Sequence, residues 1–146
     1  MKSSRRRSRE LALQGLYAWQ LSGEGALGLR SQLAGSDEFR KADEAYFDRL
    51  LQGTIEQAAE IERLLAPALD RKPEELSPIE HGILLMATFE LRNLPEVPYK
   101  VIINEAVELA KSFGGTDGHK YVNGVLDRVA KTLRPATGSG ATQSAQ

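Results

Sequence analysis

The sequence predicts an all-α fold. Nearly every long segment carries apolar residues at intervals of three and four, which is the helical period and not the alternation typical of strands. Proline and glycine residues stand between these segments, at positions where helices end. A chain of 146 residues fits one domain, large enough to bury about two thirds of its unfolded surface. We therefore expect a single helical domain over residues 5–135, overlapping a basic N-terminal arm over residues 1–10.

The first half of the chain predicts three helices. The first passes from the basic arm into an apolar repeat and ends near Leu21, before a glycine-rich turn over residues 22–28. A short helix is expected over residues 29–33. One long helix is expected over residues 42–65, because its apolar positions form a single broad stripe: Tyr46, Phe47, Leu50, Leu51, Ile55, Ala58, Ile61, Leu64 and Leu65.

A proline-flanked connector leads to the next helix. Pro67 and Pro73 bracket this connector, which has room for one helical turn. Ser77 then provides an N-cap, Pro78 suits the first helical position, and Glu80 is placed to close a capping box. These signals predict a helix that starts at Ser77 and Pro78 and runs to about residue 94.

Two further helices complete the pattern. The first follows Pro98 and is closed by Gly114 as a C-cap, with a core face of Ile102, Ile103, Ala106, Val107, Ala110 and Phe113. Asp117 is placed to cap the last helix, over residues 119–133. Residues 136–146 are Ala, Thr, Gly, Ser and Gln only, and none of them anchors a core, so we expect a disordered tail.

Composition excludes several classes of protein. The chain has no cysteine, which rules out disulfides, cysteine-ligated zinc and thiol catalysis. No segment approaches transmembrane length, and Glu10, Gln14 and Gln20 interrupt the run that a signal peptide would need. We expect a soluble, cytoplasmic protein. An organellar transit peptide is the alternative, opposed by Tyr17 and Trp19, which belong to a core-forming helix.

Charge is distributed unevenly. The whole chain has a formal net charge of −1 and its first nine residues contribute +5, which leaves −6 for the remainder. Most of the surface would therefore repel phosphate, and any contact with nucleic acid should be confined to a basic strip.

The basic strip stands where a helix begins. A helix start favours acidic residues because its free N–H groups carry partial positive charge, so arginines there work against stability. Arginine also presents planar donor forks that match phosphate oxygens. These residues therefore point to RNA or DNA, with a solvated tail as the alternative; they are Lys2, Arg5, Arg6, Arg7 and Arg9.

The sequence contains no convincing catalytic or metal centre. It lacks a Walker loop and a dinucleotide fingerprint. The only histidines, His81 and His119, have no second His or Cys at ligand spacing. The pairs Glu80 with His81 and Asp117 with His119 could suggest acid–base chemistry, but adjacent helical residues diverge, and Asp117 is explained as a cap. We expect no enzyme, no cofactor and no metal.

A second candidate for RNA contact lies at the start of the last helix. Lys120, Tyr121 and Asn123 supply a cation, a ring and an amide within one turn, a combination suited to unpaired bases. The alternative is that Tyr121 belongs partly to the core and Lys120 is an ordinary solvated lysine.

Three separated blocks resemble the NusB family of bacterial transcription antitermination factors. They read RRRSRELALQGLYAWQ at residues 5–20, VPYKVIINEAVELAKSFG at residues 97–114 and HKYVNGVLD at residues 119–127. The resemblance spans about residues 2–135. It implies two packed three-helix bundles plus a short extra helix. It also implies binding of boxA RNA together with NusE, a small-subunit ribosomal protein, and delivery of both to RNA polymerase in ribosomal-RNA antitermination.

The resemblance also implies a set of site residues. One residue departs from the pattern, since Tyr121 stands where relatives carry Phe, which keeps the ring. The residues expected near NusE are Glu80, Pro98, Tyr99 and Ile102. The residues expected to contact RNA are Lys2, Arg5, Arg6, Arg7, Arg9, Tyr17, Asp117, Lys120, Tyr121 and Asn123.

Other interpretations of the function remain open. The arm could bind an acidic protein, which would make the chain a scaffold. NusB-like domains also occur fused to ribosomal-RNA cytosine methyltransferases, but this sequence has no strands and no glycine-rich cofactor loop. Whether the free protein is a monomer or a homodimer is left open.

Overall fold

The prediction of an all-α protein is confirmed by a computed structural model, which describes residues 2–135. Within this range the chain contains no strand, and the expected disordered tail at residues 136–146 lies outside it. Two 3-10 turns occupy Ala66–Ala68 and Pro73–Glu75. The α-helices are α1 (Ser4–Ser22), α2 (Ala26–Leu33), α3 (Asp37–Lys41), α4 (Glu44–Glu56), α5 (Ala58–Leu65), α6 (Pro78–Asn93), α7 (Tyr99–Phe113) and α8 (Gly118–Leu133).

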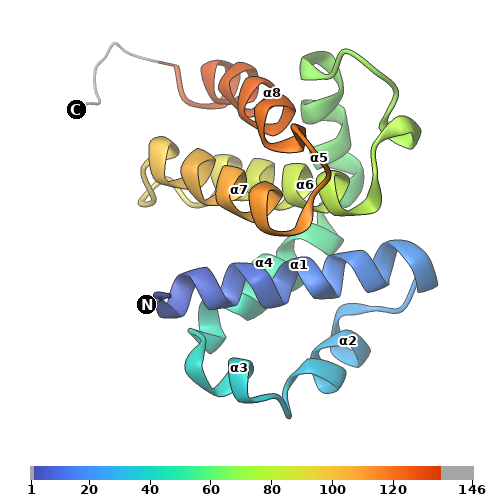
Figure 1. The fold of residues 1–146 in the computed structure, drawn as a ribbon, viewed down its shortest axis with the longest axis vertical. Helices are drawn as coiled ribbons and strands as arrows, with labels where there is room; N and C mark the ends of the chain where they lie inside the picture. Colours follow the sequence, from blue (N-terminus) through green and yellow to red (C-terminus); the bar gives the residue numbers. More distant parts are fainter. Residues whose placement is uncertain (1, 136–146) are drawn as a thin grey trace.

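The helices form two groups that meet at α6. In the first group α1 packs against α2, α3 and α4; in the second, α6, α7 and α8 pack together and α5 lies against α6. Figure 1 shows α8 uppermost, α6 and α7 below it, then α1, with α2 and α3 at the base. Both α1 and α4 contact α6, which is buried throughout residues 82–91. One continuous apolar core therefore joins the two groups.

The long helix expected over residues 42–65 is two helices. Gln57 separates α4 from α5 and leaves the helical conformation, with φ −101° and ψ 13°. Its side-chain oxygen accepts a hydrogen bond from Asn93 Nδ2 at 3.0 Å, at the end of α6. The apolar repeat continues unbroken across Gln57, so periodicity gave no sign of the break.

Helix α3 was not predicted. It has five residues, with Ser36 as a capping residue whose Oγ accepts from Phe39 N at 3.1 Å. Phe39 packs edge-on against Phe47, with ring centroids 5.3 Å apart. A single apolar residue cannot show a period; the cap followed by Asp37 and Glu38 was the available signal.

The start of α6 agrees with the predicted cap in part. Ser77 Oγ accepts from Glu80 N at 3.1 Å, as expected. At this helix start the backbone N–H of Ser77 makes no reciprocal hydrogen bond to the Glu80 side chain. Instead the Glu80 carboxylate lies against the start of α8, where a Cβ added to Gly118 would come within 2.2 Å of Glu80 Oε2.

The loop between α7 and α8 differs from expectation. Gly114 ends α7 as predicted but in an extended conformation, and it must be glycine because a Cβ would lie 2.7 Å from the Ala110 carbonyl oxygen. The prediction that the Asp117 side chain caps α8 is wrong. Asp117 adopts a left-handed conformation, with φ 64°, instead of the extended conformation usual for an N-cap, and its side chain makes no capping hydrogen bond. Its Oδ1 lies 3.4 Å from Lys120 Nζ instead.

Arg134 fastens the end of α8 to the end of α6. Its guanidinium donates to the carbonyl oxygens of Glu90, Leu91, Leu94 and Val97. The last carbonyl groups of a helix lack partners within the helix, and Arg134 supplies donors to the carbonyl oxygens of Leu91 and Val97 while it shares those of Glu90 and Leu94 with backbone N–H groups. Burial lowers the pKa of Arg134 from its usual value.

Candidate nucleic-acid interface

The basic start of the chain is helical. Helix α1 begins at Ser4, and Ser3 Oγ accepts from Arg6 N at 3.1 Å. The first turn of α1 contains no acidic residue, so its arginines are held next to the unfavourable end of the helix dipole. Residues 4–10 thus belong to α1, and the arginines of this segment are presented from a helix.

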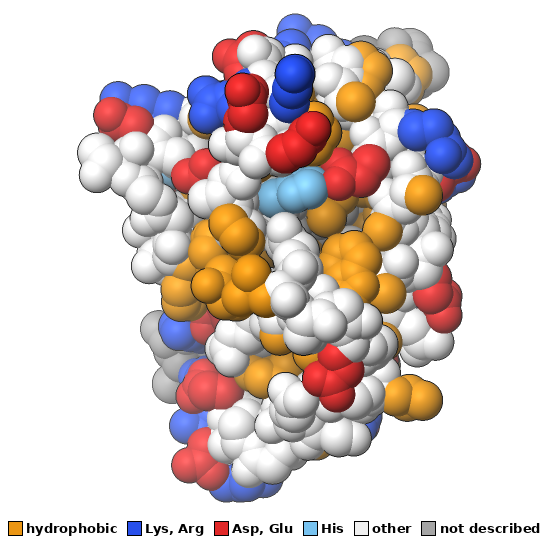
Figure 2. All heavy atoms as spheres, turned by 90° about the vertical axis from the view of Figure 1, so that its right-hand side faces the viewer, with side chains coloured by type: hydrophobic (Ala, Val, Ile, Leu, Met, Phe, Trp, Pro, Cys, Tyr) orange, Lys and Arg blue, Asp and Glu red, His pale blue; other side chains and the backbone are white. Residues whose placement is uncertain are grey.

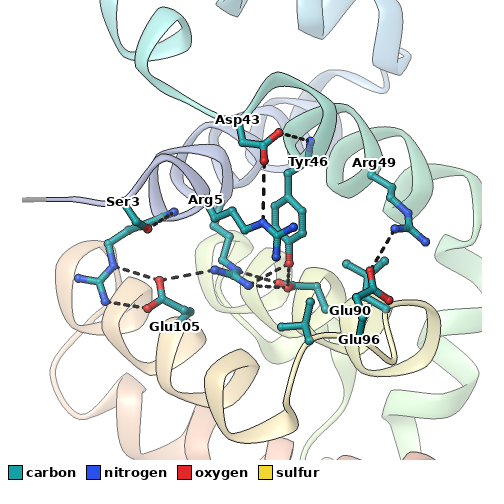
Figure 3. A network of polar contacts seen from close by, with 12 residues as sticks. Ser3, Arg5, Asp43, Tyr46, Arg49, Glu90, Glu96 and Glu105 are labelled. Carbon is teal, nitrogen blue, oxygen red and sulfur yellow. Dashed lines mark hydrogen bonds and ion pairs between the residues drawn. The ribbon is translucent and has the colours of Figure 1, made fainter.

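Arg9 lies inside the protein. Its side chain is 5% exposed, and its Nε and Nη2 donate to Glu90 Oε1 and Oε2 at 3.0 and 2.8 Å. Nη2 also donates to the Tyr46 hydroxyl at 2.9 Å, and Figure 3 shows that hydroxyl pointing toward the Glu90 carboxylate. Burial acts to lower the pKa of Arg9, but its hydrogen bond and attraction to Glu90 raise it. This guanidinium has no free face, so its position does not support the predicted phosphate contact.

The other arginines of α1 reach the surface. Arg6 donates to both oxygens of Glu105, at 3.0 and 2.8 Å. Arg7 donates to Glu38 at 2.8 Å. The Arg5 guanidinium lies 4.4 Å from the centroid of the Tyr46 ring. Lys2 Nζ, just before the helix, lies 2.9 Å from Glu10.

The expected stacking ring on α8 is covered by an arginine. The Arg71 guanidinium lies 4.0 Å from the centroid of the Tyr121 ring, and its side chain is 43% exposed. Burial, and then the neighbouring Asp70, raise the pKa of Tyr121. Lys120 and Asn123 are exposed beside it. Sequence reasoning missed Arg71, because it stands fifty positions earlier in a connector with no repeating pattern.

Tyr17 belongs to an apolar groove and not to the arginine cluster. It follows Arg6 by eleven residues on α1, or about 16 Å along the axis. Phe113, expected in the core, is 46% exposed because it is the last residue of α7. The groove has a volume of about 310 Å³ and is lined by Glu10, Leu13, Gln14, Tyr17, Ile79 and Phe113.

The same side of the molecule exposes further hydrophobic groups. Figure 2 shows the face that carries the end of α1 and the start of α6, with hydrophobic side chains at the surface in its middle part. Charged side chains lie above and below them. An apolar groove inside such a face fits another protein better than a phosphate backbone.

The residues predicted to meet NusE do not form one patch. Glu80 lies at the start of α6, whereas Pro98 and Tyr99 precede and begin α7, at the other end of this antiparallel helix pair. The two ends are separated by about 20 Å of helix. Tyr99 is exposed, but Ile102 is 1% exposed and packs in the core, so its prediction as a surface contact is wrong.

Two other features are absent from the described part of the chain. Residues 2–135 contain no group of three or more His, Asp or Glu side chains placed to hold a metal ion. None of the helices in this range is both long enough and apolar enough to cross a membrane.

Known proteins of similar sequence cover almost the whole chain. The transcription antitermination protein NusB of Paraburkholderia phytofirmans is 55% identical over 134 residues, 92% of this chain and 93% of the relative. That of Nitrosospira multiformis is 57% identical over 128 residues, 88% of this chain and 81% of the relative.

Solved structures share the fold. T. maritima NusB matches with a TM-score of 0.79 at 31% identity, covering 90% of this chain and 93% of its own. A crystal structure of the antitermination factors NusB and NusE in complex with dsRNA matches with a TM-score of 0.74 at 23% identity, covering 87% and 96%. The NusB family model matches residues 6–131. The chain therefore belongs to the NusB family.

Proposed function

We propose that this chain is a transcription antitermination factor that binds boxA-type single-stranded RNA together with NusE. It would join the antitermination complex on RNA polymerase, promote processive transcription of ribosomal RNA operons and act in the cytoplasm. The family relationship supports this role. The observation that carries it is the cluster of Arg5, Arg6 and Arg7 at the surface of one helix start, in a chain whose remainder is acidic.

The proposed RNA surface has two parts. The first is the start of α1, where Lys2, Arg5, Arg6 and Arg7 would contact phosphates. The second is the start of α8, where Lys120 would contact phosphate, Asn123 would bond to a base edge, and Asp117 would border the RNA. There the outer face of Arg71, supported by Tyr121, offers a planar cationic surface on which a base can stack.

We assign the apolar groove to the protein partner. Glu80 adjoins it through Ile79, which lines the groove together with Tyr17 and Phe113. A groove with apolar walls and an acidic border suits a protein side chain flanked by a basic group. Tyr17 is thus proposed as a NusE contact in place of the RNA role expected from sequence, and Tyr99 as a separate, exposed contact.

The test is a titration of labelled boxA RNA, with and without NusE. The change is the triple substitution Arg5→Ala, Arg6→Ala and Arg7→Ala. The control variant carries alanine at three arginines outside the proposed RNA surface, Arg49, Arg63 and Arg92. With five proposed phosphate contacts, four on the first part of the surface and Lys120 on the second, the slope of log affinity against log salt should be about −3.5 in the wild type and flatten by about 2 in the triple variant.

The control variant keeps the wild-type slope if the proposal holds. NusE should tighten binding by the wild type. An affinity and slope that are the same in the wild type and the triple variant would refute the RNA site.

A further inference from the structure

Every basic side chain at the start of the protein faces a carboxylate. The five pairs join Lys2 to Glu10, Arg5 to Asp43, Arg6 to Glu105, Arg7 to Glu38 and Arg9 to Glu90. The sequence of this segment has a charge of +5, but in the folded chain five carboxylates from α1, α3, α6, α7 and the residue before α4 neutralise it locally. The surface offered to a phosphate is therefore much less positive than the sequence suggests.

Two of these pairs are placed to compete with RNA. Glu105 of α7 receives two hydrogen bonds from Arg6, and Glu38 of α3 receives one from Arg7. Both glutamates reach the surface, unlike Glu90, which is buried with Arg9. Asp43 and Glu10 are set aside, because Asp43 caps α4 and Lys2 is a single flexible point charge.

A carboxylate and a phosphate bind an arginine guanidinium with the same geometry. Each presents two oxygens that accept parallel hydrogen bonds from the guanidinium fork. Arg6 commits Nε and Nη2 to Glu105 in this way. A phosphate that approaches Arg6 must therefore displace Glu105 or share its donors.

We propose that Glu38 and Glu105 are internal competitors of RNA phosphate. They hold Arg7 and Arg6 in the free chain and lower its affinity for any RNA backbone. An RNA that also makes base contacts overcomes this loss, whereas one that offers only phosphates does not at the same concentration. This inference rests on the proposed function, since it assumes that the arginines bind RNA.

The competition persists at neutral pH. The hydrogen bond from Arg6, opposed by partial burial, lowers the pKa of Glu105 from its usual value. Glu105 thus stays ionised and paired with Arg6 at neutral pH. The competing charges of Glu38 and Glu105 are held by the folded chain itself, so they act without a conformational change.

The experiment compares Glu38→Gln, Glu105→Gln and their combination with the wild-type full chain. The probes are labelled boxA RNA and a single-stranded RNA of equal length without the boxA sequence, followed by fluorescence anisotropy. Ion pairs that reach the protein surface are weak, so we expect each substitution to tighten binding of both RNAs by about three-fold, and the double variant by about ten-fold.

The matched control is Glu60→Gln. Glu60 is also a surface glutamate paired with two arginines, Arg63 and Arg92, but it lies on α5. It gives the same change in net charge, and its effect on RNA affinity should stay within about two-fold. In an Arg6→Ala background, Glu105→Gln should lose most of its effect, because the arginine that it releases is gone.

The outcomes separate the two proposals. If Glu38→Gln and Glu105→Gln leave affinity unchanged, or weaken it as positioning residues would, the masking inference is overturned while the RNA site stands. If the triple arginine variant binds RNA like the wild type, both proposals fail. Circular dichroism of each variant confirms that the helices are retained.

Discussion

Arg9 of α1 and Glu90 of α6 form a buried ion pair between the two groups of helices. Their side chains are 5% and 2% exposed, and Tyr46 of α4 hydrogen-bonds to both. Burying a charge is costly unless the partner is present, so each residue fixes the position of the other. The pair sits directly beneath the proposed phosphate contacts and holds the start of α1 in place.

Removing one member of this pair should destabilise the fold. Glu90→Gln removes the carboxylate that binds Arg9 through two hydrogen bonds and leaves only the more distant Glu105, whose Oε1 lies 3.7 Å from Arg9 Nη1. We expect a loss of about 3 kcal/mol in the free energy of unfolding. Urea unfolding measures this loss.

Replacing both residues, as Arg9→Met with Glu90→Leu, should recover part of the loss and leave RNA affinity unchanged, because Arg9 does not reach the surface. The exposed Glu96→Gln serves as control, with an effect below about 1 kcal/mol. Weaker RNA binding by the folded double variant would show that Arg9 contacts RNA after all.

The pairing of Arg71 with Tyr121 makes a second prediction. Stacking of one base is worth about 1 kcal/mol or more, so Arg71→Ala should weaken boxA binding at least about five-fold. Tyr121→Phe should have little effect, because the ring remains and only the buried hydroxyl is lost. Anisotropy titration measures both, with the exposed Arg63→Ala as control. If Arg71→Ala and Arg63→Ala give the same affinity, the stacking role of Arg71 is refuted.

Close packing between α4 and α6 predicts a sensitive glycine. A Cβ on Gly53 would come within 2.4 Å of the Phe89 ring, so Gly53→Ala should force the ring to move and cost about 1–3 kcal/mol. Thermal unfolding records the change. Gly35→Ala is the matched control, because nothing lies within 4 Å of its added Cβ. Equal melting temperatures for the two variants would contradict this packing.

The ion pair of Glu105 predicts a stability change in acid. The pKa of Glu105 is lowered by its hydrogen bond to Arg6, from an ordinary value of 4.5. The pair therefore contributes fully above pH 4.5, and this contribution is lost as the pH falls through the lower pKa of the folded state. Glu105→Gln should lose less stability than the wild type over that acid range, as measured by urea unfolding at a series of pH values. Parallel curves for the two proteins would argue against the shift.

Local signals predicted most of the helices but not their interruptions. The N-cap at Ser77 and the glycine at Gly114 act within one turn, so they are readable from neighbouring residues. The break at Gln57 depends on Asn93, and α3 depends on the packing of Phe39 against Phe47. Such contacts join distant residues, and no local pattern encodes them.

The sequence identified the residue types of the candidate site but not whether each side chain is buried or exposed. Arginines at a helix start pointed to phosphate, and Arg5, Arg6 and Arg7 do reach the surface. Arg9 has the same chemistry but faces inward, where its partner Glu90 is 81 positions away. Two sequence-based predictions concern Ile102: its apolar repeat placed it in the core, and the family resemblance placed it near NusE. The structure confirms the core position.

The contacts of Arg134 define where the folded unit ends. The family match stops at residue 131, whereas apolar packing continues to Leu133, which lies partly buried against the core. A chain cut at residue 131 would lose Leu133 and the Arg134 guanidinium, which donates to four carbonyl oxygens around the end of α6. Two of these oxygens, those of Glu90 and Leu94, also accept backbone N–H groups, whereas those of Leu91 and Val97 depend on Arg134. The folded unit therefore extends through residue 134, where the hydrogen bonds of Arg134 continue beyond the last apolar contact.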